Sequence, residues 1–185
     1  AVLEWAGNCI MIDIASNITL LRQQVPSSVK IVAVSKKKSV SDILTAYNAG
    51  QRQFGENRVQ ELLSKKDHLP GDIEWHLIGH LQTNKVKDIA PFISVIHSVD
   101  TGRLLTAINK EAGKAGRIID CLLQFHIAKE ETKFGFNMEE VTQLVESEEF
   151  RNLLNLNICC VMGMATFTDN IDLVREEFVY LRNCF

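Results

Sequence analysis

Short apolar runs alternate with longer amphipathic stretches along the whole chain. Six short runs, rich in β-branched and aromatic residues, predict strands at 30–35, 52–56, 73–79, 94–99, 118–128 and 157–166. Most of them are continuously apolar, which is typical of parallel strands that are covered on both faces. The pattern therefore favours a buried parallel sheet.

The stretches around these strands have the period of amphipathic helices. Helices are expected over 8–24, 39–50, 59–69, 84–93, 101–116, 137–147 and 169–185. Three of them begin at capping residues. Ser39 lies three residues before Asp42 in a capping-box arrangement, and Thr101 and Asn137 stand at the starts of their helices. Gly50 marks the end of the helix that Ser39 begins.

A strand followed by a helix, repeated six times, predicts a parallel sheet with right-handed crossovers. Two α/β architectures fit this repeat, a doubly wound sheet and a (β/α)8 TIM barrel with six of its eight strands present. No G-x-G-x-x-G pattern follows the first strand, which disfavours a dinucleotide-binding sheet. No linker or low-complexity stretch divides the sequence, so we expect one domain over 8–185.

Composition narrows the possible partners. The net charge of −3 offers no basic excess for a nucleic acid backbone, and no apolar run approaches the ~18 residues that cross a bilayer. The first ten residues lack the basic start of a signal peptide. Two interpretations of residues 1–10 stay open: an extension that is not native, with Met11 as the natural start, or a part of the natural chain.

The five cysteines indicate a compartment. Their number is odd and no C-x-x-C pair occurs. Four of them lie in apolar surroundings, where they are expected to behave as small buried hydrophobic residues in a reducing environment. The sequence therefore predicts a cytoplasmic protein.

Ligands of both architectures bind at the carboxyl ends of the strands, which draws attention to the lysines that end the first strand. Val34 and Lys36 share one face by alternation. Burial lowers the pKa of a lysine and frees its amine to attack a carbonyl. Lys36 is therefore the candidate nucleophile, whereas Lys37 and Lys38 are expected in a solvated turn.

Other strand ends carry weaker candidates. Asn57 follows the second strand and is expected either to cap the next helix or to face the site. His80 follows the third strand and could reach the mouth of a barrel. Its spacing from His76 gives no metal site, because that segment is predicted as a strand and its exit loop. Lys133 could recruit an anion, and Met164, beside the small Gly163, allows close approach of a ligand.

Taken in order, these segments resemble the pyridoxal 5′-phosphate homeostasis protein family. The segments that carry the resemblance are AVSK (33–36), FGEN (54–57), WHLIGHLQTNK (75–85), HSVD (97–100), EETKFGF (130–136) and MGMATFTD (162–169). The resemblance implies a single barrel domain like that of fold-type III alanine racemase. It implies that Lys36 holds the aldehyde of pyridoxal 5′-phosphate as a Schiff base, and that Lys133 handles the cofactor at a secondary site. We expect Asn57, His80 and Met164 to contact the cofactor.

The sequence departs from the family in two places. After the fifth strand it has Phe125-His126-Ile127-Ala128 where many members have an asparagine and a glycine. The two further strand regions of the family, with their phosphate-binding residues, do not follow Phe185. A (β/α)8 barrel takes ~250 residues, so we expect the sequence to be part of a longer protein that has ~60 more.

The resemblance favours a carrier over a catalyst. A racemase of this type needs a second acid/base, and the only tyrosines, Tyr47 and Tyr180, fall in predicted helices. We therefore expect a monomeric, non-enzymatic protein that stores, buffers or delivers the cofactor, with pyridoxal phosphate-dependent apo-enzymes as partners. The alternatives are a Schiff-base barrel enzyme such as an aldolase, and slow amino-acid racemisation.

Overall fold

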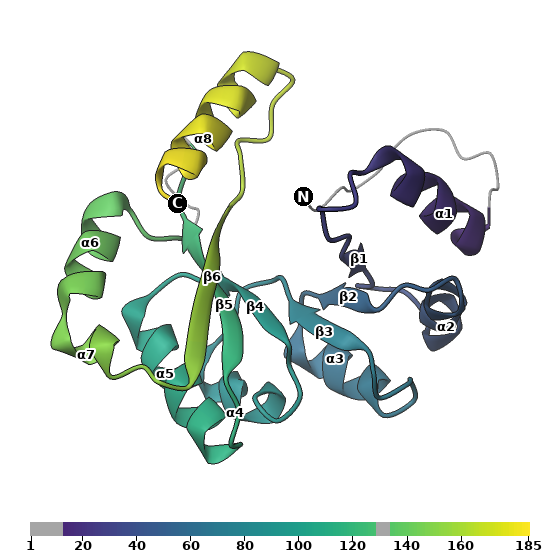
Figure 1. The fold of residues 1–185 in the computed structure, drawn as a ribbon, viewed down its shortest axis with the longest axis horizontal. Coiled ribbons are helices and arrows are strands. Elements are labelled where there is room, and N and C mark those ends of the chain that lie inside the picture. Colours follow the sequence, from purple (N-terminus) through teal and green to yellow (C-terminus); the bar gives the residue numbers. More distant parts are fainter. Residues whose placement is uncertain (1–12, 129–133) are drawn as a thin grey trace. The chain divides into compact units, whose positions relative to one another are not determined.

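The computed structural model describes residues 13–128 and 134–185. Its strands are β1 Ala33–Val34, β2 Gln53–Glu56, β3 Glu74–Leu77, β4 Val95–Val99, β5 Ile119–Phe125 and β6 Leu156–Gly163 (Figure 1). Its helices are α1 Ile14–Gln24, α2 Val40–Asn48, α3 Val59–Lys66, α4 Val86–Ile89, α5 Gly102–Lys114, α6 Met138–Glu146, α7 Glu148–Arg151 and α8 Ile171–Asn183. The strand order of the sheet is the order of the chain. The predicted alternation of parallel strands and helices is confirmed.

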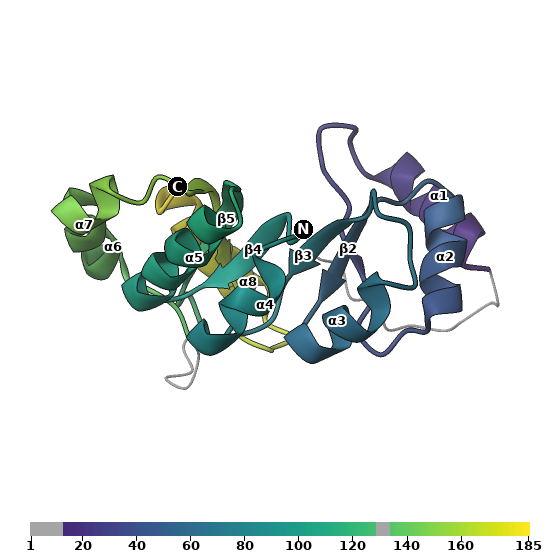
Figure 2. The ribbon, with the colours of Figure 1, turned by 90° about the horizontal axis from the view of Figure 1, so that it is seen from below.

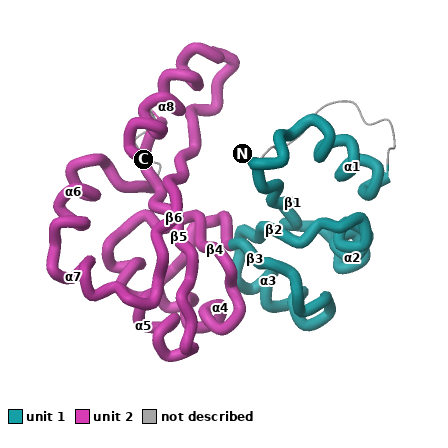
Figure 3. The backbone as a smooth tube through the Cα atoms, viewed as in Figure 1, with its two compact units in different colours: residues 1–76 teal, residues 77–185 magenta. Residues whose placement is uncertain are grey.

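The chain divides into two compact units (Figure 3). The first unit ends at His76 and the second begins at Leu77, so the boundary falls within β3. The expectation of a single domain over 8–185 stays a prediction.

The first unit contains the end of β1 that carries Lys36. β1 pairs with β2 in parallel, with Val34 opposite Gly55. The helix α2 that follows β1 has the predicted capping box, in which Asp42 N donates to Ser39 Oγ over 3.1 Å and Ser39 N donates to Asp42 Oδ2 over 3.1 Å. The chain leaves this helix through Gly50, whose φ of +91° is the left-handed conformation that favours glycine. Local capping thus fixes the turn between the strand end and its helix.

The second unit is built around β5, which pairs in parallel with β4 and with β6. The helix α5 begins at Thr101, whose Oγ1 accepts a hydrogen bond from Leu104 N over 3.3 Å, as the sequence predicts. Its buried face consists of Leu104, Leu105, Ile108 and Ala112. Helices α4 and α5 contact each other and lie next to β4 and β5 (Figure 2).

Several predicted boundaries are wrong. The first strand spans only Ala33 and Val34 instead of the expected 30–35, because only these two residues pair with β2. The helix expected over 84–93 is a 3-10 turn, Thr83–Lys85, followed by the short α4. Pro91 lies just beyond α4 and cannot continue a helix. The short α7 was not predicted.

The expectation that the cysteines are buried is wrong for two of them. Cys121, on the central β5, is buried, whereas Cys159 and Cys160 are exposed. Both lie on β6, the last strand in the sheet order, and an edge strand is covered less than a central one. Within the two described ranges, no helix is long and apolar enough to cross a membrane.

Candidate functional site

Lys36 lies two residues beyond the end of β1, at the carboxyl end of the strand. The amide of the preceding Ser35 still donates to the carbonyl of Gly55 on β2 over 2.9 Å. The chain then turns sharply, because Lys37 has a φ of +61° and Lys38 N donates back to Ser35 O over 3.0 Å. Lys36 is half-buried, while Lys37 and Lys38 are exposed. The predicted exposed turn after Lys36 is confirmed.

An ionic network formed by Glu56, Glu61 and Lys65 contacts this turn. Glu56, at the end of β2, has no exposed surface, and Lys65 on α3 is 7% exposed. Lys65 Nζ donates to Glu56 Oε1 over 2.8 Å and to Glu61 Oε1 over 2.7 Å. It also donates to the carbonyl oxygen of Ser35 over 2.9 Å, and Ser35 Oγ donates to Glu56 Oε1 over 2.7 Å. The residue before Lys36 is therefore held by both its backbone and its side chain.

The charges in this network stabilise one another. Burial alone lowers the pKa of the Lys65 ammonium, but the hydrogen bonds to Glu56 and Glu61 outweigh it, and the pKa of Lys65 is raised. The hydrogen bond from Lys65 lowers the pKa of Glu61. Lys65 is therefore a fixed positive charge, and charge-assisted hydrogen bonds of this kind are about twice as strong as neutral ones.

Sequence reasoning did not identify this network. Glu56 and Lys65 are nine residues apart, on a strand and a helix, and only the fold brings them together. A signal was present in Lys65, which falls on the same helix face as Val59 and Leu62, both buried. A lysine on an apolar helix face is rarely buried unless it is paired.

Asn57 is the other predicted site residue in the first unit. Because Val34 pairs with Gly55, Lys36 and Asn57 each lie two residues beyond the same rung of the ladder. The two residues thus occupy equivalent positions beyond neighbouring strands, whereas Ser35 and Glu56 are joined by a hydrogen bond. Asn57 does not cap the next helix, since α3 has Arg58 at its N-cap position and no side-chain cap. The capping interpretation of Asn57 is therefore wrong.

His80 belongs to the second unit, where it follows β3 as predicted. Its Nδ1 lies 3.1 Å from Asp100 Oδ2, and Asp100 directly follows β4. The His80 side chain is 48% exposed, whereas that of Asp100 is 5% exposed. The His80 ring stacks on Phe134, with ring centroids 4.6 Å apart. A carboxylate at one ring nitrogen and an aromatic ring against its face fix the orientation of the imidazole.

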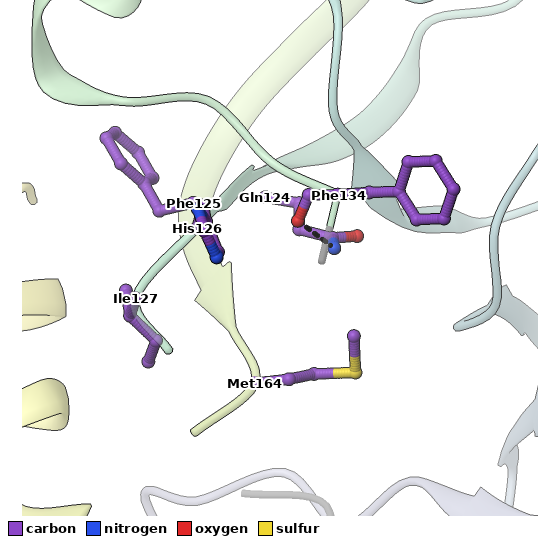
Figure 4. Close-up of a pocket in the computed structure, with 6 residues that line it drawn as sticks. All are labelled: Gln124, Phe125, His126, Ile127, Phe134 and Met164. Carbon is purple, nitrogen blue, oxygen red and sulfur yellow. Dashed lines mark hydrogen bonds between the residues drawn. The ribbon is translucent and has the colours of Figure 1, made fainter. Parts of the chain in front are cut away.

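Met164 lines a small pocket at the end of β5 and β6, together with Gln124, Phe125, His126, Ile127 and Phe134 (Figure 4). Gln124 Nε2 donates to the carbonyl of Phe134 over 2.9 Å, which holds that residue at the pocket. Phe134 thus lines the same pocket as Met164, and its ring also stacks on the His80 ring. A Cβ on Gly163 would lie 2.8 Å from Ile127 Cδ1, so the Ile127 side chain packs against this glycine. The expectation that Gly163 and Met164 allow close approach of a ligand stays a prediction.

Two points of the sequence analysis remain, Lys133 and a metal site. Lys133 lies outside the described residues. In the part of the chain that the structure describes, no group of three or more His, Cys, Asp or Glu side chains is arranged to hold a metal ion. The described site residues thus form two groups, Lys36 and Asn57 in one unit and His80 and Met164 in the other.

These features define a parallel α/β protein of the barrel type with a lysine amine at the end of its first strand. The model of the family described as alanine racemase, N-terminal domain, matches residues 12–184. The chain is 38% identical over 139 residues to the pyridoxal phosphate homeostasis protein of Synechocystis sp., covering 74% of this chain and 63% of that protein. It is 34% identical over 172 residues to the protein of that name from Haemophilus influenzae, covering 86% and 72%. The chain belongs to the alanine racemase N-terminal domain family and, within it, to the pyridoxal phosphate homeostasis proteins.

Solved structures agree with this assignment. PipY of Synechococcus elongatus PCC7942 is 34% identical, with TM-scores of 0.85 without PLP and 0.82 with PLP bound. These matches cover 92% of this chain and 80% and 79% of PipY. Alanine racemase of Clostridium difficile 630 is 12% identical with a TM-score of 0.73, covering 93% of this chain and 46% of the racemase, and so shares the fold alone. The predicted family and fold class are confirmed, and the chain spans 63% of the length of its Synechocystis relative.

Proposed function

We propose that this protein binds pyridoxal 5′-phosphate through the Lys36 amine and takes part in storing, buffering or delivering the cofactor. The observation that carries the proposal is the place of Lys36, half-buried at the carboxyl end of β1, with the adjoining residues held by a buried network. Support also comes from the name that the relatives share and from the PipY structure with PLP bound.

The residues of the first unit fit this cofactor. When bound, pyridoxal 5′-phosphate supplies an aldehyde carbon and a ring that delocalises charge. The Lys36 amine would hold the cofactor through that carbon, and the aldehyde oxygen would leave as water. Lys36 offers the required primary amine, and Asn57, at the equivalent position beyond β2, offers an amide that can donate or accept. The expected contacts of Asn57, His80 and Met164 with the cofactor, and the secondary role of Lys133, stay predictions.

A spectroscopic titration with matched variants tests the proposal. The purified protein is mixed with pyridoxal 5′-phosphate, and the visible absorption band of the lysine adduct is followed. We expect the band in the wild type and in Lys38→Ala, which changes an exposed lysine two residues away. We expect Lys36→Ala to abolish it. A full band in Lys36→Ala would show that another amine binds the aldehyde.

We further propose that the protein is a carrier without catalytic turnover. The hydroxyl of Tyr47 donates to Asp72 Oδ1 over 2.6 Å, and Arg52 lies 3.9 Å above the centre of its ring. The bond to Asp72 raises the pKa of Tyr47, which makes it a poorer acid at neutral pH. We expect no solvent deuterium at the α-carbon of an added amino acid above that caused by free cofactor, measured by NMR. Faster incorporation would identify a racemase-like activity.

The remaining features of the proposal concern the protein in the cell. We propose a cytoplasmic monomer that passes the cofactor to pyridoxal phosphate-dependent apo-enzymes. The odd number of cysteines, five, supports a reducing compartment, because the disulfide frameworks of secreted proteins take an even number. Transfer is measured by mixing loaded protein with an apo-enzyme and following recovery of its activity. Direct delivery predicts recovery faster than the release of free cofactor allows, whereas equal rates would indicate storage alone.

A further inference from the structure

We propose that Glu56 is a positioning residue for Lys36 and acts with Lys65 on the backbone at each side of it. This inference rests on the proposed role of Lys36 as the cofactor-binding amine. Glu56 itself contacts the residue before Lys36. Ser35 Oγ donates to Glu56 over 2.7 Å, which places Glu56 behind the strand end, on the face where α3 packs.

The contacts of this network reach the residues that precede and follow Lys36. Before Lys36, the Ser35 carbonyl accepts from Lys65 Nζ over 2.9 Å and its hydroxyl donates to Glu56. After Lys36, the amide of Lys37 donates to Glu61 Oε1 over 2.6 Å. That same Glu61 oxygen accepts from Lys65 over 2.7 Å. One buried ammonium therefore ties both flanks of Lys36 to α3.

The conformation of Lys37 shows why such a tie is needed. A non-glycine residue with a φ of +61° is held in the left-handed region, which is unfavourable for a lysine without compensating contacts. The hydrogen bond from Lys37 N to Glu61 stabilises this turn. The turn sets the direction in which the strand end presents Lys36. If the network weakens, we expect the turn to relax and the Lys36 amine to spend less time in the reactive orientation.

The carboxylate of Glu56 makes all its hydrogen bonds through one oxygen. Oε1 accepts from Ser35 and Lys65, whereas Oε2, although buried, has no hydrogen-bond partner among the described residues. A glutamine at this position could therefore accept from both Ser35 and Lys65 through its single oxygen. Its NH2 group would take the place of Oε2, which accepts no hydrogen bond. Glu56→Gln keeps the geometry and removes the charge, while Glu56→Ala removes both.

The test compares these two variants in the rate at which Lys36 forms its adduct with added pyridoxal 5′-phosphate. Misplacing a reacting group by about 1 Å slows a reaction by on the order of 100-fold. We expect Glu56→Ala to slow the reaction by roughly 10-fold to 100-fold on that scale, and Glu56→Gln to recover much of the rate. Leu105→Ala serves as a matched control, because Leu105 is fully buried on α5 in the other unit. Per folded molecule, it should react at the wild-type rate.

A second readout needs no cofactor. Hydrogen–deuterium exchange of the Lys37 and Lys38 amides in the unliganded protein should accelerate in Glu56→Ala and stay slow in Leu105→Ala. Should Glu56→Ala fail to fold, Ser35→Ala removes only the hydroxyl and should show the same changes to a smaller degree. Wild-type adduct rates and wild-type exchange in the folded variants would overturn the inference. Failure of the wild type to form any Lys36 adduct would instead refute the proposed function, and the exchange data would still test the positioning of the turn.

Discussion

Replacing Lys65 by methionine removes the buried ammonium of the network and leaves its partners in place. Lys65 Nζ makes three hydrogen bonds, of 2.9 Å to Ser35 O, 2.8 Å to Glu56 Oε1 and 2.7 Å to Glu61 Oε1. The Glu61 side chain is 24% exposed and can be solvated, whereas that of Glu56 is 0% exposed and would remain a buried charge without a counterion. Breaking a buried ion pair in this way costs about 3–5 kcal/mol, a large share of the roughly 5–15 kcal/mol that stabilises a domain.

Urea unfolding followed by circular dichroism measures this cost. With a slope of about 2 kcal/mol per molar urea, a loss of about 4 kcal/mol lowers the midpoint by roughly 2 M. Lys66→Met is the control, because Lys66 pairs with the exposed Asp67, and such a surface pair contributes at most about 1 kcal/mol. Adding Glu56→Gln to Lys65→Met should restore part of the lost stability, since it removes the buried charge. A loss below about 1 kcal/mol in Lys65→Met, or an equal loss in Lys66→Met, would refute the reasoning.

Three further predictions follow from single residues. Gly135→Ala should destabilise the protein by more than about 1 kcal/mol in thermal unfolding. The reason is that Gly135 has a φ of +143° and that a Cβ there would lie 2.5 Å from His126 N. An unchanged melting temperature would contradict this prediction. The pKa of Glu61 is lowered below 4.5, so Glu61 stabilises the fold above that pH and the contribution is lost on acidification below it. Glu61→Gln should therefore flatten the loss of stability below pH 4.5, and an unaltered acid profile would argue against the ion pair. Burial raises the pKa of Cys121 to about 12, so a thiol reagent at pH near neutrality should label the exposed Cys159 and Cys160 before Cys121. Mass spectrometry that finds Cys121 labelled in native protein would contradict its burial.

The parts of the fold that depend on local interactions could be predicted from the sequence. Ser39, Thr101 and Asn137 all cap helices as expected, because each cap involves residues only three positions apart. Strand ends could not be predicted as well, because they depend on pairing with a distant partner. Ile31 and Val32 are apolar like strand residues, yet β1 pairs with β2 only at Ala33 and Val34.

For the candidate site, too, some features could be predicted from the sequence and others could not. The position of Lys36 at the end of a strand could be predicted, because it follows an apolar run, and the carboxyl ends of parallel strands are where ligands bind. Asp100 was missed as the partner of His80, although its position directly after a predicted strand was visible in the sequence. The pairing of Glu56 with Lys65 could not be read from the sequence, because it arises only when α3 packs behind β2. The position of Lys65 on the buried face of α3 indicates that it needs a partner, but it does not identify Glu56 as that partner.

The central claim is that Lys36 is the amine that holds pyridoxal 5′-phosphate. The most direct test is to mix the purified protein with the cofactor, reduce the adduct with borohydride and locate it by tandem mass spectrometry. Fragmentation must separate Lys36 from its neighbours Lys37 and Lys38, which are exposed and serve as internal controls. We predict one reduced cofactor per chain, on Lys36. An adduct confined to another lysine, or spread evenly over all three, would contradict the account.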